Sequence, residues 1–264
     1  MSTTPQTAPA TGNQQPATSN QQPVPTHLRL LSSLFCIPLM ASTTAIFGCI
    51  SLVCGLWDGS GRQQHFVARQ WARTMLRLAF CRITIVGKDK LNPPPLAVYA
   101  SNHLSYMDTP LLFASLPFQF RILAKQGLWK IPFVGWYLRR SGQVPIDASS
   151  PRSAIAGLLR GVKALNAGLP LFVFPEGARS ADGTLHPMAS GGAFMAIRAG
   201  VPLVPLALIG THELLPMHVY ALRPRPLKII VGDPIPTGGL TTRDADALTA
   251  QLYSAITAMY DEYN

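Results

Sequence analysis

Hydrophobic residues along this chain form one long uncharged run, followed by short apolar segments that polar stretches separate. The long run extends from Leu30 to Trp57. Because roughly 20 apolar residues cross a bilayer as a helix, we predict a membrane segment over residues 28–57. Pro38 and Gly48 would bend such a helix, so the segment is either transmembrane or re-entrant. A cleaved signal peptide is disfavoured, since its apolar region would be about half as long.

The two flanks of this run differ in character. Residues 1–27 are mainly Thr, Ser, Gln, Pro and Ala, with no Lys, Arg, Asp or Glu, a composition that predicts a disordered tail. Residues 58–80 predict an amphipathic helix, which either lies in the membrane interface or packs on the domain. Its basic flank places the following domain on the cytoplasmic side. One arc of this helix carries Arg62, Arg69, Arg73 and Arg77, opposite Val67, Trp71, Met75 and Leu78.

Beyond residue 80, apolar segments of strand length alternate with helical patterns, as is typical of a largely parallel sheet with helices on both faces. We therefore predict the α/β class, with one domain over residues 81–264 behind an N-terminal membrane-associated helical segment. The predicted strands are 82–86, 96–101, 120–124, 143–146, 169–174, 201–209 and 227–231. The predicted helices follow Pro110 and Ser150-Pro151 and cover 128–140, with a break at Pro132, 191–199 and 242–260. In the helix after Ser150-Pro151, the predicted buried stripe is Ile155, Leu158, Leu159, Val162 and Leu165.

Composition narrows the classes of function. Hydrophobic residues make up 48% of the chain and the formal net charge is +10. A basic, apolar chain suits either nucleic acid or an anionic membrane surface; the long apolar run favours the membrane, and we expect no nucleic-acid partner. The cysteines form no Cys-x-x-Cys and no Cys/His spacing, so we expect reduced thiols and no metal site. They are Cys36, Cys49, Cys54 and Cys81.

A first polar cluster follows the strand predicted at 96–101. On one α-helix, residues five positions apart would point roughly 140° apart, so His103 and Asp108 meet only if His103 lies in a strand-to-helix loop. Pro110 fits best at the first helical position, which leaves Asp108 just outside the helix. A capping box from Ser105 to Asp108 would instead put Pro110 inside the helix. An imidazole oriented by a carboxylate can take a proton from an alcohol, so this pair is a candidate general base.

A second polar loop follows the strand predicted at 169–174. Glu176 and Arg179 straddle Gly177, which lets backbone approach a ligand closely, and the arginine fork suits phosphate. Ligands of open α/β sheets bind beyond the carboxyl ends of the strands, so the two loops are expected to converge. Local sequence alone equally allows a solvated turn in which Glu176 and Arg179 pair with each other.

The two loops together resemble the glycerolipid acyltransferases of the 1-acylglycerol-3-phosphate acyltransferase type. The first is Asn102-His103-x4-Asp108 and the second is Phe174-Pro175-Glu176-Gly177-x-Arg179-Ser180. Within residues 80–235, three further stretches match that family: 142–147, 201–206, and Lys125 with Pro132-Phe133-Val134-Gly135. Two positions depart from the family pattern, because Ala148 stands where Arg is usual and Ala178 where Thr is usual. Both departures bear on the head group of the acceptor.

The resemblance implies a membrane-bound acyltransferase of phospholipid biosynthesis. His103 would deprotonate the hydroxyl of 1-acyl-sn-glycerol-3-phosphate, which attacks an acyl thioester to give phosphatidate, and Asp108 would orient the imidazole. Glu176, Gly177 and Arg179 would bind the glycerol-phosphate part, with Lys125 as a further phosphate partner. The donor would be acyl-CoA or acyl carrier protein. No cofactor and no metal are implied, and the catalytic domain would lie on the cytoplasmic side of the cytoplasmic membrane.

Three other functions fit part of the pattern. A hydrolase would use Ser105 with His103 and Asp108, although the chain has no Gly-x-Ser-x-Gly elbow. A non-catalytic membrane-binding module would explain the apolar run and the arginines but not the two polar loops. Within the enzyme reading, another lysolipid, such as a lyso-ornithine lipid or a lysophospholipid, is the alternative acceptor.

Overall fold

The computed structural model describes residues 25–92, 95–219 and 221–264. The predicted disordered tail lies outside the described residues, except for its last three positions. Helix α1 already begins at Thr26.

A seven-stranded sheet forms the centre of the molecule, in the order β1-β7-β6-β2-β5-β3-β4. Only β6 and β7 pair in antiparallel fashion, and every other neighbouring pair is parallel. The predicted α/β class with a largely parallel sheet is therefore confirmed, and all seven predicted strands are present. They are β1 (Ile83–Val86), β2 (Val98–Ser101), β3 (Arg121–Lys125), β4 (Val144–Ile146), β5 (Leu171–Val173), β6 (Leu203–Ile209) and β7 (Leu227–Val231).

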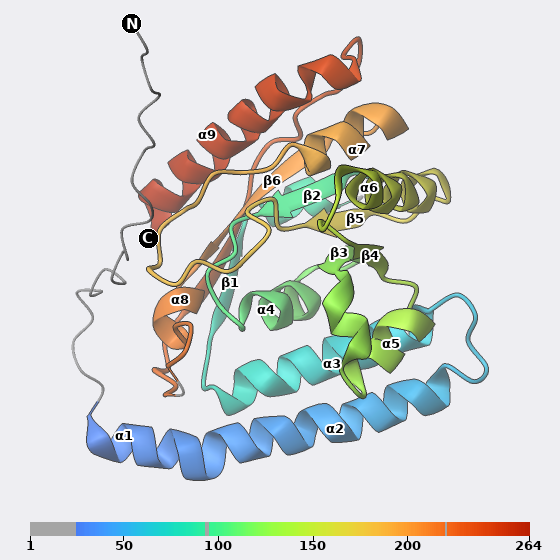
Figure 1. Cartoon of the computed structure of the whole chain (residues 1–264). Helices are drawn as coiled ribbons and strands as arrows, with labels where there is room; N and C mark the ends of the chain where they lie inside the picture. Colours follow the sequence, from blue (N-terminus) through green and yellow to red (C-terminus); the bar gives the residue numbers. More distant parts are fainter. Residues whose placement is uncertain (1–24, 93–94, 220) are drawn as a thin grey trace, which may run out of the picture.

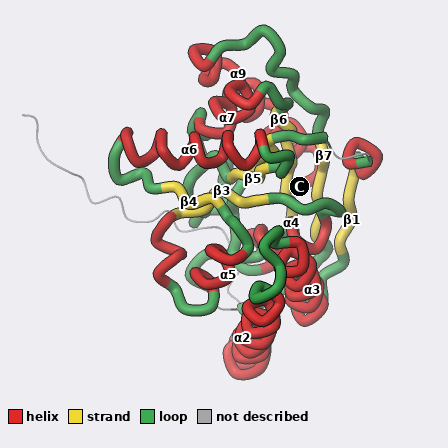
Figure 2. Tube along the Cα trace, turned by 90° about the vertical axis from the view of Figure 1, so that its right-hand side faces the viewer, coloured by secondary structure: helices red, strands yellow, loops and turns green. Residues whose placement is uncertain are grey.

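Helices cover both faces of this sheet, with α6, α7 and α9 on one face and α3, α4 and α5 on the other (Figure 2). Successive side chains of a strand point to opposite faces, and β2 shows this clearly: Tyr99 belongs to the core that includes α3 and α4, whereas Val98 and Ala100 belong to the core that includes α6, α7 and α9. The helices are α3 (Arg62–Leu78), α4 (Asp108–Ser115), α5 (Val134–Arg140), α6 (Pro151–Asn166), α7 (Gly191–Ala199), α8 (Thr211–Leu214) and α9 (Ala245–Tyr263). Short 3-10 turns are η2 (Lys88–Leu91), η3 (Gln126–Lys130) and η4 (Thr242–Asp244).

The long apolar run forms a continuous helix that lies beside α3 in the opposite direction (Figure 1). It comprises α1 (Thr26–Leu31), the π-helical turn η1 (Ser32–Cys36) and α2 (Ile37–Cys54). Pro38 is the second residue of α2, two positions after the π turn ends, and the irregular hydrogen bonding of this region accommodates its missing N–H. The Arg29–Cys54 part of this continuous helix is long and apolar enough to cross a membrane. Of its most apolar 18 residues, 17% are buried.

Hydrogen bonds attach this helix to the domain near its start and at its middle, and another holds the loop that follows it. Near its start, the Ser32 hydroxyl accepts the N–H of Leu222 at 3.1 Å. At its middle, the Trp71 indole of α3 donates to the Thr44 hydroxyl at 3.1 Å. Just beyond its end, the Arg121 guanidinium donates to the Ser60 carbonyl at 2.8 Å. The apolar helix is thus attached to the folded domain.

Two details of the helices differ from the sequence predictions. Helix α4 begins at Asp108 rather than after it, so Pro110 lies third in the helix; this is tolerated because N–H groups of the first turn have no partner within the helix. In α6, Ile155 and Leu159 are 51% and 46% exposed instead of buried. The helix packs through Gly157 and Gly161, where an added Cβ would press on Ile146 and on Met195, so the buried face is rotated toward the glycines.

Candidate active site

His103 and Asp108 meet at the carboxyl end of β2, as their spacing predicted. His103 lies in the loop between β2 and α4, and its Nδ1 is 2.8 Å from Oδ2 of Asp108. The imidazole is 11% exposed and the carboxylate is fully buried. The Nδ1 atom is therefore engaged by the carboxylate, which leaves Nε2 as the atom able to take a proton from a substrate.

The Asp108 carboxylate also fixes the loop that carries the histidine. Its Oδ2 accepts the N–H groups of Leu104 at 2.7 Å and Ser105 at 2.8 Å. The end of β2 is fixed as well, because the Asn102 side chain donates to the Leu208 carbonyl and accepts the Leu208 N–H across the adjacent strand β6. These bonds to the single buried oxygen Oδ2 hold the loop in one conformation.

The second loop comes from the end of β5 and packs directly on His103. The Phe174 ring stacks on the imidazole with ring centroids 3.8 Å apart and planes 17° apart. Glu176 Oε1 accepts the His103 N–H at 2.8 Å, and the Ser180 N–H donates to the His103 carbonyl at 2.9 Å. The predicted convergence of the two loops is confirmed, and Glu176 bonds to His103 rather than pairing with Arg179.

Glu176 has an unusual electrostatic environment. Partial burial raises its pKa from 4.5 to about 7, and the nearby Asp108 carboxylate acts in the same direction. The N–H groups of His103 and His186, which the carboxylate accepts, oppose that rise. The protonation state of Glu176 therefore changes near neutral pH.

Arg179 stands over the first loop. Its Nε donates to the Ser105 carbonyl at 3.2 Å, and its guanidinium carbon lies 4.7 Å from the centroid of the Tyr106 ring. These contacts engage Nε and one face of the guanidinium, so that its outer nitrogens remain able to donate to an anion. Gly177 has a positive φ of 72°, which glycine adopts without strain, and open space lies beside it.

Lys125, the remaining predicted site residue, is the last residue of β3 and is exposed. It lies at the same edge of the sheet as the two loops, and its neighbours Ala124 and Leu128 line the cavity described next. Within the described residues no ion pair joins Lys125 to a carboxylate.

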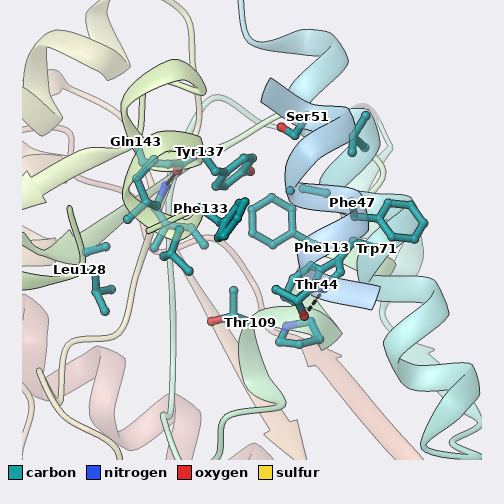
Figure 3. A pocket seen from close by; sticks show the side chains of 18 of the residues that line it. Thr44, Phe47, Ser51, Trp71, Thr109, Phe113, Leu128, Phe133, Tyr137 and Gln143 are labelled. Atoms are coloured by element: carbon teal, nitrogen blue, oxygen red, sulfur yellow. Dashed lines mark hydrogen bonds between the residues drawn. The ribbon is translucent and has the colours of Figure 1, made fainter. Parts of the chain in front are cut away.

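An apolar cavity of about 310 Å³ starts beside these loops and extends between the N-terminal helices and the domain. At one end Tyr106, Thr109 and Arg179 line it. Residues of α2, including Ser51, face Phe133 and Tyr137 across the cavity (Figure 3). The remaining lining residues include Phe47, Gly48, Val67, Ala68, Trp71, Phe113, Ile122, Leu138 and Gln143. The apolar helix therefore forms one wall of the cavity.

The hydrolase alternative is not supported by the position of Ser105. Its hydroxyl donates to the Leu215 carbonyl at 2.8 Å and accepts the Met107 N–H at 3.1 Å. The residue is fully buried. Ser105 thus contributes to loop structure and is not hydrogen-bonded to the candidate base.

Several residues of this site gave no separate signal in the sequence. Phe174, Tyr106 and Ser180 belong to the quoted motifs, but nothing in their spacing indicated contact with His103 or Arg179. The cavity residues come from five stretches of the chain, between Thr44 and Arg179. Among the described residues, no group of three His, Cys, Asp or Glu side chains is arranged to hold a metal ion.

The fold and site define a class of protein: an α/β domain in which the loop that carries a buried His–Asp pair also lines an apolar cavity. A family model described as Acyltransferase matches residues 82–209, from the start of β1 to the end of β6. Residues 82–209 match this acyltransferase family, and the predicted resemblance is confirmed.

Relatives and a solved structure agree with this assignment. The chloroplastic 1-acyl-sn-glycerol-3-phosphate acyltransferase of Arabidopsis thaliana is 35% identical over 195 residues, covering 71% of this chain and 54% of the relative. The 1-acyl-sn-glycerol-3-phosphate acyltransferase of Chlamydomonas reinhardtii is 33% identical, covering 73% and 58%. The crystal structure of the 1-acyl-sn-glycerophosphate acyltransferase of Thermotoga maritima matches with a TM-score of 0.74 at 22% identity, covering 89% of this chain and 95% of that one. That structure shows a shared fold. The chain spans little more than half the length of the curated relatives it matches.

Proposed function

We propose that this protein transfers an acyl group from an acyl thioester to the free hydroxyl of 1-acyl-sn-glycerol-3-phosphate and so forms phosphatidate. The observation that carries this proposal is a His–Asp pair in the loop whose Tyr106, together with Arg179, lines an apolar cavity. An acyl chain needs an apolar site, a hydroxyl needs a base, and a phosphate needs a cation. All three are present within one edge of the sheet.

The geometry suits direct acyl transfer. Nε2 of His103 takes the proton of the acceptor hydroxyl while Asp108 stabilises the imidazolium that forms. The hydroxyl oxygen attacks the thioester carbonyl, and the tetrahedral intermediate collapses with cleavage of the C–S bond. The proton on His103 passes to the departing thiolate, which gives a free thiol and restores the neutral base. The scheme involves acyl-CoA or acyl carrier protein as a co-substrate and no cofactor or metal.

Recognition of the acceptor phosphate is assigned to Arg179, with Lys125 as a second cation at the same sheet edge. The outer nitrogens of Arg179 form a fork that suits a phosphate in two hydrogen bonds. Gly177 is exposed between Glu176 and Arg179, so that its backbone is accessible to the glycerol part of the acceptor.

The proposed site of action is a membrane surface. The outer side of the α1–α2 helix exposes large apolar side chains, while its inner side is hydrogen-bonded to the domain. We propose that this helix lies along one leaflet and does not cross the bilayer, as in the re-entrant alternative. The α3 arginines would then face the lipid phosphates, with the domain on the cytoplasmic side. The exposed apolar residues include Leu34, Phe35, Leu39, Ile46, Ile50, Val53, Leu56 and Trp57.

An acceptor panel tests this function directly. The purified protein is given lysophosphatidate, a lysophospholipid or a lyso-ornithine lipid, together with either an acyl-CoA or an acyl carrier protein thioester. We expect phosphatidate from lysophosphatidate at the highest kcat/KM. Faster transfer to a phosphate-free lysolipid would instead favour the alternative acceptors, to which Ala148 and Ala178 draw attention. Absence of transfer to every acceptor would reject the acyltransferase proposal.

A further inference from the structure

Two carboxylates accept the three consecutive backbone N–H groups of the His103 loop. Glu176 accepts the N–H of His103 at 2.8 Å. Asp108 accepts the next two, from Leu104 and Ser105, at 2.7 and 2.8 Å. The loop that presents the imidazole is therefore held from both sides, by α4 through Asp108 and by the β5 loop through Glu176.

Both oxygens of Glu176 are engaged in this arrangement. Oε1 bonds to the His103 N–H, and Oε2 accepts the His186 N–H at 3.2 Å. Two other residues of the β5 loop also contact His103: Phe174 stacks on its imidazole, and the Ser180 N–H donates to its carbonyl. Three residues of this loop thus contact the one histidine through its N–H, its carbonyl and its ring.

Charge argues in addition against a place for Glu176 in the acceptor site. The acceptor carries a phosphate, and its hydroxyl gains negative charge as the base removes the proton. A carboxylate in contact with either group would oppose binding or reaction. The two carboxyl oxygens of Glu176 instead accept backbone N–H groups.

From these contacts we propose that Glu176 is a positioning residue for His103 and does not bind the acceptor. Its carboxylate fixes the His103 backbone, so that the imidazole keeps Nδ1 on Asp108 and presents Nε2 to the hydroxyl. This inference rests on the proposed acyl transfer and assigns the β5 loop two separate tasks: Phe174, Glu176 and Ser180 hold the base, while Arg179 holds the phosphate.

The test compares Glu176→Gln and Glu176→Asp with the matched control Glu262→Gln, which alters an exposed glutamate in the last turn of α9. Glutamine keeps one acceptor oxygen but turns an N–H₂ group toward the other backbone N–H, and aspartate keeps the charge but shortens the reach. Because small misplacements of a catalytic group cost about 10²-fold, we expect kcat to fall by about that factor in Glu176→Gln. The KM for lysophosphatidate should stay within about threefold of the unmodified protein, and Glu262→Gln should be unchanged.

A second readout needs no turnover and separates this inference from the proposed function. The imidazole signals of His103 are followed by NMR in detergent micelles without substrate. Glu176→Gln and Glu176→Asp should both shift these signals, while Glu262→Gln should not. Unmoved His103 signals, or a tenfold rise in acceptor KM with kcat retained, would overturn the inference. Should both Glu176 variants fail to fold, the unmodified protein still decides, because rapid hydrogen exchange of the His103 amide would contradict the bond to Glu176.

Discussion

The guanidinium carbon of Arg179 lies 4.7 Å from the ring centroid of Tyr106, so that the β5 loop and the β2–α4 loop touch where the apolar cavity begins. A cation–π contact of this kind holds the guanidinium over the face of the ring. Arg179 also donates to the carbonyl of Ser105. Through these two contacts, the proposed phosphate-binding residue Arg179 packs on the β2–α4 loop that also carries the proposed base.

Replacing Arg179 tests the phosphate assignment. Arg179→Lys keeps the charge but removes the fork and the stacking on Tyr106, so we expect it to be far from neutral. The acceptor KM should rise, and kcat should fall as well if the contact positions the hydroxyl. The KM for the acyl donor should stay nearly constant in steady-state kinetics. A rise in donor KM alone would reassign Arg179 to the phosphates of coenzyme A and leave Lys125 for the acceptor.

Removing the base should nearly abolish turnover. His103→Ala is expected to lose at least the ~10²–10⁴-fold that general-base catalysis supplies, measured as kcat in folded protein. Asp108→Asn should also be severely impaired, because an amide can donate to Nδ1 and favour the wrong tautomer. An activity of His103→Ala within tenfold of the unmodified enzyme would exclude the proposed mechanism, and Ser105→Ala should retain the chemistry if the hydrolase reading is wrong.

Glu176 should make stability depend on pH in an identifiable window. Its pKa is raised from 4.5 to about 7 in the folded protein, so between these values the folded state binds more protons than the unfolded state. The free energy of unfolding should therefore fall as pH rises from about 4.5 to about 7 and should then level off. Chemical denaturation across this range measures the slope. Glu176→Gln should lose that component, whereas Glu262→Gln should keep it.

Gly48 offers a way to fill the cavity from α2. An added Cβ at Gly48 would lie 3.6 Å from Cβ of Phe133, an ordinary contact, so Gly48→Ala should be tolerated. Gly48→Leu would occupy part of the cavity, and each methylene of a donor kept out of it forfeits about 0.8 kcal/mol, or about fourfold in kcat/KM. A series of acyl donors should show long chains losing most and short chains losing least. An equal loss at every chain length would place the acyl chain elsewhere.

Truncation of the apolar helix should affect attachment and catalysis together. A chain that begins near Arg62 loses the exposed apolar surface and should remain on vesicles only through its arginines, in a form that high salt removes. It also loses the wall formed by Thr44, Phe47 and Ser51, so kcat/KM for long donors should fall even in detergent. Membrane retention of the truncated chain after a high-salt wash would show that the apolar helix is not the sole anchor. Release of the full chain under the same wash would exclude the integral association proposed here.

Local pattern in the sequence was sufficient for the framework of this protein. All seven strands were predicted because buried parallel strands read as short apolar runs between polar turns. The contact of His103 with Asp108 followed from five-residue spacing at a strand-to-helix junction. The start of α6 was equally local, since the Ser150 hydroxyl caps it and Pro151 occupies the first turn. In each case the deciding interactions lie within a few residues of one another.

Contacts between distant segments were decided only by the tertiary structure. Glu176 and His103 are 73 residues apart, and no local rule specifies that their bond replaces a pairing of Glu176 with Arg179. The apolar pattern of α6 did not reveal that Gly157 and Gly161 permit the closest approach to its neighbours and leave Ile155 outside. The uncharged run likewise predicted a membrane segment but not a cavity wall. The same hydrophobic effect stabilises apolar side chains in a bilayer and in a protein interior. Only the packing of α2 beside α3 and α5 shows that this helix can both contact a membrane and form a wall of the cavity.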